Sequence, residues 1–496
     1  MKNVAKINDS TGMRTYVRSL YFILAKSVED LFPGRNLYIE HSLSKGYYCE
    51  IESKQELTND EVRAISCRMQ EIIDADYPFL THEAKSEDII ALFREKGLYD
   101  KALLLETAGE IYSHYNSLDG FIDSYYGDLL PSTKYLYLFG IEKCSKGLLL
   151  RVPNPEKPNE LQPYVQQDKM LSVFQELIQY QRKMRMTNVG DLNRAIEKGR
   201  VSLVVKVSEA MQERKIAQIA DEILARYADG VRIALISGPS SSGKTTFCKR
   251  LQVQLLVNSL YPLNISLDDY YVNRVNTPLD ETGEYDYESI EAIDLPKFNE
   301  DLKKILAGEK ISLPTYDFTK GERVYRGNTA QLGKNSIIVM EGIHAMNPAL
   351  LPEIDPASTY KIYVSALTSI SLDNHNGIST TDNRLLRRII RDSQFRGYSA
   401  TETISRWASV RKGEDKWIFP FQENADVMVN SAMLYEFAAL RRMAEPILNE
   451  VPQTAPEYAE ARRLLKLLRF FNYINIEELP NTSLLREFVG GSSFSY

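Results

Sequence analysis

Short apolar runs recur through the second half of the chain and alternate with segments of helical periodicity. The runs are residues 231–237, 263–267, 337–340, 360–366 and 426–430. Strands that are apolar along their whole length belong to sheets that helices cover on both faces, and such sheets are mostly parallel. The pattern therefore predicts the α/β class, with a doubly wound and mostly parallel sheet.

A proline-rich break separates this half from the first part of the chain. Residues 152–163 contain four prolines between an apolar, strand-like run and a helical pattern that covers 165–185 and 208–226. Clusters of this kind mark loops and domain edges. We expect a first domain over 1–160, a helical connector over 161–207, and a second domain over 208–496 with a helical C-terminal extension.

Composition and charge narrow the class of protein. Hydrophobic residues make up 44% of the 496 positions, which is ordinary for a globular protein. The 67 acidic residues outnumber the 60 basic ones, so the overall charge argues against nucleic acid as a partner. The four cysteines show no Cys-x-x-Cys pair, and no run reaches about 18 apolar residues. We expect a cytoplasmic protein with reduced thiols and no membrane span.

The strongest chemical signal is the segment GPSSSGKT, which fits G-x-x-x-x-G-K-S/T and lies between a buried strand and an amphipathic helix. In this strand–loop–helix order, backbone N–H groups and the helix N-terminus bind phosphates, the lysine reaches the β- and γ-phosphates, and the threonine hydroxyl binds Mg²⁺. The sequence predicts a site for ATP formed by Gly238, Ser240, Ser241, Ser242, Gly243, Lys244, Thr245 and Thr246.

Two carboxylates follow other buried strands. Asp268 ends the run 263–267, which we place beside the strand of the phosphate loop. There it could accept a hydroxyl proton during phosphoryl transfer, although a turn-capping aspartate is the simpler alternative. Glu341 ends the run 337–340, where a P-loop fold holds its metal-associated carboxylate. We expect His344 to pack or cap rather than to catalyse.

A row of arginines forms the third cluster. Arg384, Arg387, Arg388 and Arg391 share one helical face, opposite a stripe of leucines and isoleucines. Guanidinium groups concentrated in an acidic chain are typical of phosphate binding, and a solvated basic face is the alternative. Arg396 and Gly397 follow, as suits a mobile lid.

Taken in order, these motifs resemble the uridine kinase and phosphoribulokinase branch of the P-loop kinases. The likeness covers about residues 237–431 and includes LDDYY, PTYDF, VMEGIHA, RLLRRIIRD and FPFQENADVMVNS. It implies that Asp268 is the general base for a sugar 5′-hydroxyl, with Lys244 and Arg387 as further catalytic residues. It also implies a Mg²⁺ site at Thr245 and Glu341. The acceptor contacts would be Tyr271, Asp286, Tyr316, Phe318, Arg384 and Arg391.

The chain departs from that family at the end of the site that recognises the base. Pyrimidine kinases carry a histidine three residues after the phenylalanine of PxYDF, and this chain has Gly321 there. Losing a side chain that bonds a base edge removes a discriminator between analogues. A different nucleoside or another small alcohol therefore stays open as the acceptor.

The first part of the chain resembles the second additional domain of threonyl-tRNA synthetases, an α+β editing module. The likeness rests on GYYCEI and on LTNDEVRAISCRMQEIIDADYPF with the segment after it. The module's site histidines and cysteine correspond here to Arg18, Phe22, Tyr125 and Leu129. Because none of these binds Zn²⁺ or activates water, we expect neither editing nor metal binding. His41, a lone imidazole, we interpret as structural.

A synthetase-like domain joined to a kinase is typical of a bacterial group of uridine kinase-like nucleoside kinases, to which the closing motif SLLREFVGGSSF is also similar. We predict an ATP- and Mg²⁺-dependent kinase for a nucleoside 5′-hydroxyl that acts as a homo-oligomer. Two alternatives remain: a regulatory or RNA-associated NTPase, and a kinase of the sugar or pantothenate type.

Overall fold

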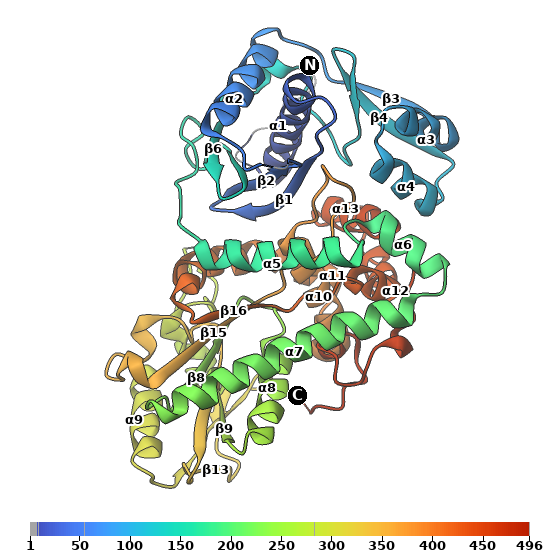
Figure 1. Cartoon of the computed structure of the whole chain (residues 1–496). Coiled ribbons are helices and arrows are strands. Elements are labelled where there is room, and N and C mark those ends of the chain that lie inside the picture. The colour runs from blue at the N-terminus through green and yellow to red at the C-terminus, as the bar shows by residue number, and fades with distance from the viewer. Residues whose placement is uncertain (1–6, 8, 54, 282, 496) are drawn as a thin grey trace. The chain divides into compact units, whose positions relative to one another are not determined.

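The computed structural model describes residue 7 and residues 9–53, 55–281 and 283–495, which fold as two compact units (Figure 1). The N-terminal unit comprises Met1–Gly199, Ser369–Ser379 and Arg469–Asn472. The P-loop unit comprises Arg200–Thr368, Thr380–Leu468 and Tyr473–Tyr496. The first boundary falls inside the expected connector, and the N-terminal unit also takes two short segments from the second half of the chain.

The P-loop unit is built on a five-stranded parallel sheet in the order β16-β15-β8-β14-β9. Its strands are β8 (Ile233–Ser237), β9 (Tyr261–Ser266), β14 (Ser336–Glu341), β15 (Thr359–Ser365) and β16 (Val427–Asn430). The three inner strands are buried along almost their whole length, because helices cover both faces of the sheet. The predicted parallel sheet is confirmed.

One placement differs from the sequence analysis. We expected the strand before Asp268 to lie beside the strand of the phosphate loop, but β14 pairs with both β8 and β9 and lies between them. Hydrophobic runs predict strands without their order in a sheet, since pairing is decided by contacts distant in sequence. Asp268 is therefore two strands from the phosphate loop.

The helices of this unit follow or flank the strands, as the alternating pattern predicts. They are α7 (Val201–Ala228), α8 (Lys244–Val257), α9 (Leu295–Leu306), α10 (Thr380–Arg391), α11 (Ala400–Trp417), α12 (Glu436–Asn449), α13 (Tyr458–Arg469) and α14 (Arg486–Val489). Two small hairpins complete the unit: β10 (Ile311–Ser312) with β13 (Thr329–Ala330), and β11 (Thr315–Asp317) with β12 (Glu322–Val324).

The N-terminal unit combines helices with two antiparallel sheets. One sheet has the order β1-β2-β7-β6 and the other β3-β4-β5. The strands are β1 (Leu37–Leu43), β2 (Gly46–Ile51), β3 (Leu80–Lys85), β4 (Tyr112–Leu118), β5 (Phe121–Asp123), β6 (Gly140–Cys144) and β7 (Gly147–Arg151). The helices are α1 (Ser10–Leu31), α2 (Asn59–Asp74), α3 (Ser86–Glu95), α4 (Tyr99–Ala108), α5 (Asp168–Met184) and α6 (Val189–Glu197).

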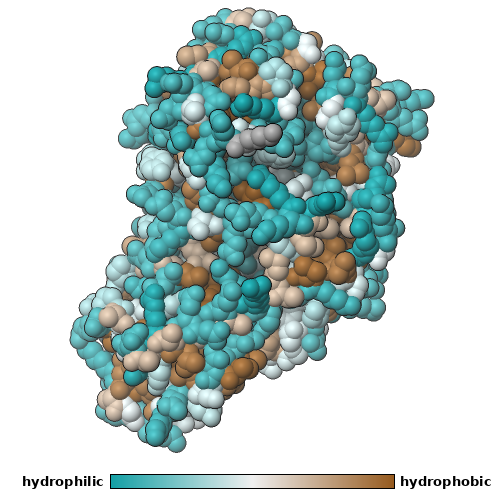
Figure 2. Space-filling view, viewed as in Figure 1, coloured by the Kyte–Doolittle hydropathy of each residue, from teal (hydrophilic) through white to brown (hydrophobic). Residues whose placement is uncertain are grey.

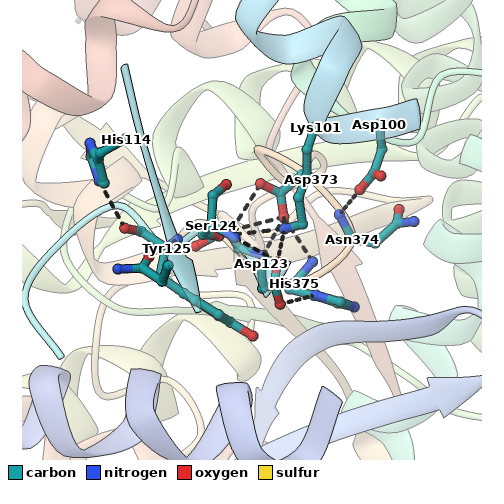
Figure 3. A network of polar contacts seen from close by, with 11 residues as sticks. Asp100, Lys101, His114, Asp123, Ser124, Tyr125, Asp373, Asn374 and His375 are labelled. Atoms are coloured by element: carbon teal, nitrogen blue, oxygen red, sulfur yellow. Dashed lines mark hydrogen bonds and ion pairs between the residues drawn. The ribbon is translucent and has the colours of Figure 1, made fainter. Parts of the chain in front are cut away.

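A buried ionic network ties the segment Ser369–Ser379 into this unit (Figure 3). The ammonium of Lys101 lies 2.8 Å from Asp123 and 2.9 Å from Asp373, and all three side chains are almost fully buried. His375 pairs with the other oxygen of Asp123 at 2.7 Å. Burial disfavours the charged form of Lys101, but the two carboxylates outweigh it and hold its pKa above the ordinary value.

None of the helices in the described ranges is long and apolar enough to cross a membrane. On the face drawn in Figure 2, hydrophobic residues are interspersed with hydrophilic ones. Isolated exposed apolar side chains of this kind are normal for folded proteins.

Removing the lysine of the network tests its structural role. Lys101→Met would leave Asp123 and Asp373 buried without their shared counter-charge, and breaking a buried pair in this way costs about 3–5 kcal/mol. We expect a clear fall in the urea midpoint that reports unfolding of the N-terminal unit. Lys134→Met is the control, because its ion pair with Asp76 is exposed and should contribute little. Equal midpoints for the two variants would contradict the assignment.

Candidate active site

The candidate residues gather where three parallel strands end. Glu341, the last residue of β14, pairs in register with Ile236 of β8 and with Ser266 of β9. The phosphate loop follows β8 directly, and Asp268 follows β9 within a short 3₁₀ turn. The carboxyl ends of parallel strands form the crevice in which open α/β sheets bind ligands. The predicted loop, base and metal carboxylate therefore share one edge of the sheet.

The phosphate loop is held by its carbonyl oxygens. Arg384 donates to the carbonyl of Ser240 at 2.9 Å, Arg387 to that of Ser241 at 3.4 Å, and the Ser431 hydroxyl to that of Ser242 at 2.5 Å. In a trans peptide the C=O and the following N–H point in opposite directions. Holding three successive carbonyls fixes the peptide planes of the loop, whose N–H groups are the expected phosphate donors. One of these groups, the Ser242 amide, donates to the Pro239 carbonyl at 3.2 Å.

The arginine row differs from its predicted arrangement. Arg384 and Arg387 are only 1% and 0% exposed, and they form ion pairs with the equally buried Glu414 and Glu436. The sequence pattern suggested a free basic face, but α10 is buried on both sides, which periodicity does not reveal. Their guanidinium groups bind loop carbonyls and glutamates, so we assign both arginines a positioning role.

The other two arginines of the row are less buried. Arg388 donates to the Ser240 hydroxyl at 3.0 Å, and Arg391 pairs with Asp392 at 3.6 Å. Burial, with a smaller contribution from the neighbouring Arg396, lowers the pKa of Arg391 to about 10. Of the predicted arginine contacts, Arg391 is the one with electrostatic influence on Asp268, together with Arg396.

Lys244, Thr245 and Glu341 form the centre of the site. The Lys244 ammonium donates to the carbonyls of Gly238 at 2.9 Å and Pro239 at 3.1 Å. Thr245 Oγ1 lies 3.5 Å from Glu341 Oε1. This hydroxyl and carboxylate are the hard oxygen donors that Mg²⁺ prefers, so the residues present fit the implied ion.

Burial controls the protonation of this centre. It raises the pKa of Glu341 to about 7, an effect that the nearby charge of Asp268 increases and Lys244 opposes. Burial also raises the pKa of Asp268, while Lys244, Arg396 and Arg391 act in the opposite direction. The pKa of Lys244 is lowered by burial. A carboxylate with a raised pKa and cations nearby is suited to accept a proton.

The aromatic residues that the sequence analysis assigned to the acceptor form one cluster. The Tyr316 ring lies 5.7 Å from that of Tyr271 and 5.0 Å from that of Phe318. The Tyr271 hydroxyl donates to the carbonyl of Tyr287 at 3.3 Å, which links the cluster to the loop that carries Asp286. Asp286 itself accepts from the Glu288 amide at 3.1 Å. Tyr271, Tyr316 and Phe318 therefore contact one another, and the hydrogen bond to Tyr287 ends one residue after Asp286.

Arg274 packs against the position where a pyrimidine kinase carries histidine. Gly321 has φ +72°, and a Cβ there would lie 2.8 Å from Arg274 Cβ and Nε, so a side chain is excluded. Arg274 Nη2 also donates to the carbonyl of Phe318 at 2.6 Å. The sequence showed that Gly321 replaces the histidine, but nothing in it indicated that the guanidinium of Arg274 lies beside Gly321.

Sequence reasoning also missed several glutamates around the loop. Glu414 accepts from the Ser240 amide at 3.0 Å, and Glu487, near the C-terminus, accepts from Thr246. Burial raises the pKa of Glu288 to about 7, and in the described structure its Oε2 is buried without a hydrogen-bond partner. Glu288 and Glu414 lie in no motif that the sequence analysis used, and the closing motif that contains Glu487 gave no sign of a contact with the loop. Each of the three residues reaches the site from a separate helix or loop.

Three of the four positions matched to the editing module lie in or against the core of the N-terminal unit. Phe22 and Tyr125 are fully buried with ring centroids 5.4 Å apart, and the partly buried Leu129 packs against the same cluster. Arg18 is only partly buried and donates to the carbonyl of Asp128 at 2.5 Å. His41 stacks on Phe174 at 4.2 Å, and burial lowers its pKa to about 3.

Comparison with known proteins agrees with this geometry. Residues 233–436 match the model of the phosphoribulokinase / uridine kinase family. The uridine kinase of Staphylococcus aureus strain JH9 is 30% identical over 195 residues, which are 39% of this chain and 84% of that protein.

Two solved structures are also similar. A possible uridine kinase from Bacillus stearothermophilus has 19% identity and a TM-score of 0.31, covering 44% of this chain and 98% of that one. A D-glycerate 3-kinase from Cryptococcus neoformans has 16% identity and a TM-score of 0.24, covering 55% of this chain and 88% of that one.

The parallel sheet with its phosphate loop defines the class: the protein is a phosphotransferase of the P-loop kinase type. Within that class, the chain belongs to the phosphoribulokinase / uridine kinase family.

The anchoring of the loop can be tested at Arg387. Arg387→Lys keeps the charge opposite Glu436 but loses the fork that also reaches the Ser241 carbonyl. We expect ADP affinity to fall about tenfold, equal to ~1.4 kcal/mol, in calorimetric titrations. Arg442→Lys on the exposed side of α12 should leave affinity unchanged. Wild-type affinity in Arg387→Lys would show that this anchor is dispensable.

Proposed function

We propose that the protein transfers the γ-phosphoryl group of ATP to the 5′-hydroxyl of a nucleoside. The observation that carries this proposal is the shared sheet edge, where the phosphate loop, Asp268 and Glu341 meet beside an aromatic cluster. Asp268 supplies a base, the loop supplies phosphate donors, and the aromatic rings offer a surface for a base. A nucleotide switch alone would need only the loop.

In the proposed reaction Asp268 accepts the proton of the acceptor hydroxyl. The hydroxyl oxygen bonds to the γ-phosphorus as the bond to the bridging β–γ oxygen breaks, which releases ADP. Lys244 stabilises the negative charge that builds on the phosphates. Thr245 and Glu341 would hold Mg²⁺, whose role is to neutralise phosphate charge.

The aromatic cluster of Tyr271, Tyr316 and Phe318 favours an acceptor with a flat ring. Arg274, beside Gly321, favours an acceptor that carries hydrogen-bond-accepting groups. Arginine donates only, so it suits carbonyl or carboxylate oxygens. A uridine-like base meets this condition, and so does an acceptor of the sugar or pantothenate type that bears an acid group.

For the N-terminal unit we propose the fold of the second additional domain of threonyl-tRNA synthetases, over about residues 1–160, with a connector to residue 207. We propose further that it no longer edits, because none of the four matched residues binds Zn²⁺ or activates water, and Phe22 and Tyr125 are buried in the core. The chain as a whole we propose to be a cytoplasmic homo-oligomer with a small-molecule substrate and no nucleic-acid partner.

Asp268→Asn tests the base. We expect kcat to fall by at least about 100-fold, with ADP affinity little changed, because a general base contributes at this level while the loop binds nucleotide. Asp269→Asn is the matched control, since Asp269 accepts the Tyr316 amide at 3.1 Å and an asparagine oxygen can do the same. Equal kcat values for the two variants would remove Asp268 as the base.

The acceptor is found by assay of the full chain. With ATP and Mg²⁺ we expect one of the common nucleosides to yield its 5′-monophosphate by mass spectrometry, against a panel that includes sugars and pantothenate. Phosphorylation of a sugar or pantothenate only would replace the nucleoside with that acceptor. ADP release that begins only when RNA is added would favour the RNA-associated NTPase.

A further inference from the structure

The C-terminal motif SLLREFVGGSSF packs directly on the phosphate loop. Gly243 of the loop has φ +83°, and a Cβ there would lie 2.4 Å from the Leu484 side chain. Leu484, Leu485 and Phe488 are completely buried. Such burial fixes the backbone of this segment beside the loop, since removing large apolar side chains from water is strongly favourable.

Glu487 of this segment occupies donors of the phosphate loop. Its Oε2 accepts from the Thr246 amide at 3.2 Å and from the Thr246 hydroxyl at 2.7 Å. Thr246 is the third residue of α8, and the first four N–H groups of a helix have no partner within it. These are the groups that bind anions at a helix N-terminus. A carboxylate of the protein thus lies where the proposed function requires phosphate.

The charged groups near Glu487 also place its carboxylate at the phosphate-binding site. Glu487 acts on the pKa of Lys244, of Glu341 and of Arg391, which are the predicted phosphate, metal and lid residues. A structural cap on a distant part of the helix would not influence all three. The carboxylate therefore lies within the phosphate-binding region of the site.

We infer that Glu487 is a built-in competitor of the nucleotide, which must displace this carboxylate from Thr246 in order to bind. The inference rests on the proposed nucleotide site and adds its regulation. Because the backbone is anchored, only the side chain of Glu487 needs to move, and the carboxylate stays near the loop at high effective concentration. Occupation of the site is then an exchange of one anion for another.

Hydrogen bonds of Arg486 within the C-terminal segment hold Glu487 close to the phosphate loop. Arg486 donates to the carbonyls of Ile476 at 2.9 Å, Leu479 at 2.7 Å and Pro480 at 3.3 Å. This single guanidinium closes the chain from 476 to 486 on itself. The arrangement leaves the neighbouring Glu487 free of any role in holding the segment together, so its loss should not release the segment.

Glu487→Gln tests the inference in the full-length protein. The amide removes the charge but keeps the size, and its oxygen can still accept from Thr246. We expect ADP to bind about tenfold more tightly than to wild type in calorimetric titrations, and the ligand-free protein to melt at a lower temperature, since a charged acceptor makes the stronger hydrogen bond. Glu478→Gln, an exposed change in the same segment, should alter neither quantity.

In Glu487→Gln the ADP affinity should rise while the melting temperature falls, and this combination distinguishes competition with the nucleotide from a contact that only stabilises the fold. A purely structural contact would lower both the melting temperature and the ADP affinity, and that result overturns the inference. Unchanged ADP affinity in Glu487→Gln also overturns it, and so does a failure of both wild type and Glu487→Gln to bind ADP. If Glu487→Gln does not fold, Glu487→Asp withdraws the carboxylate by one methylene and should tighten ADP binding to a smaller extent. Tighter ADP binding without phosphorylation of any acceptor would contradict the proposed function and leave this inference intact.

Discussion

The site depends on the outward anchoring of three carbonyl groups in the phosphate loop. Arg384, Arg387 and Ser431 hold these carbonyls and so fix the backbone that carries the loop N–H groups. The two arginines are buried, so each needs a buried partner, and Glu414 and Glu436 supply the negative charge. Removing one partner leaves an unpaired charge in the core. The same buried ion pairs therefore stabilise the fold of the P-loop unit and hold the phosphate loop in shape.

The chain connects this anchoring to the N-terminal unit without a linker. The segment Ser369–Ser379 belongs to the N-terminal unit, and the residues on either side of it meet in the P-loop unit, where the Thr368 amide donates to Thr380 Oγ1 at 3.4 Å. Thr380 begins α10, the helix that carries Arg384 and Arg387. The segment is fixed at its centre, because Asp373 shares the buried Lys101 with Asp123. The segment therefore leaves the P-loop unit at Thr368 and returns to it at Thr380, at the start of the helix that carries both arginines.

Much of the P-loop unit could be predicted from sequence, and the failures have a common cause. The five strands, the loop and the strand-end carboxylates Asp268 and Glu341 were identified because each is marked by neighbours in sequence. The position of β14 between β8 and β9 depends on pairing between distant segments. The burial of Arg387 depends on Glu436, 49 positions away, and Glu487 lies 241 positions from Thr246. Periodicity describes one helix at a time, so it cannot show which arginine meets a glutamate from elsewhere.

The same contacts explain how the site is stable without a nucleotide. Buried polar groups need partners, and a loop designed to bind phosphate would otherwise expose unpaired donors to its interior. Here Thr246 is satisfied by Glu487, and the Lys244 ammonium by the carbonyls of Gly238 and Pro239. In the described structure the buried hydroxyls of Ser241 and Ser242 stay without partners. Binding free energy is therefore a difference between new phosphate contacts and internal ones that must be broken.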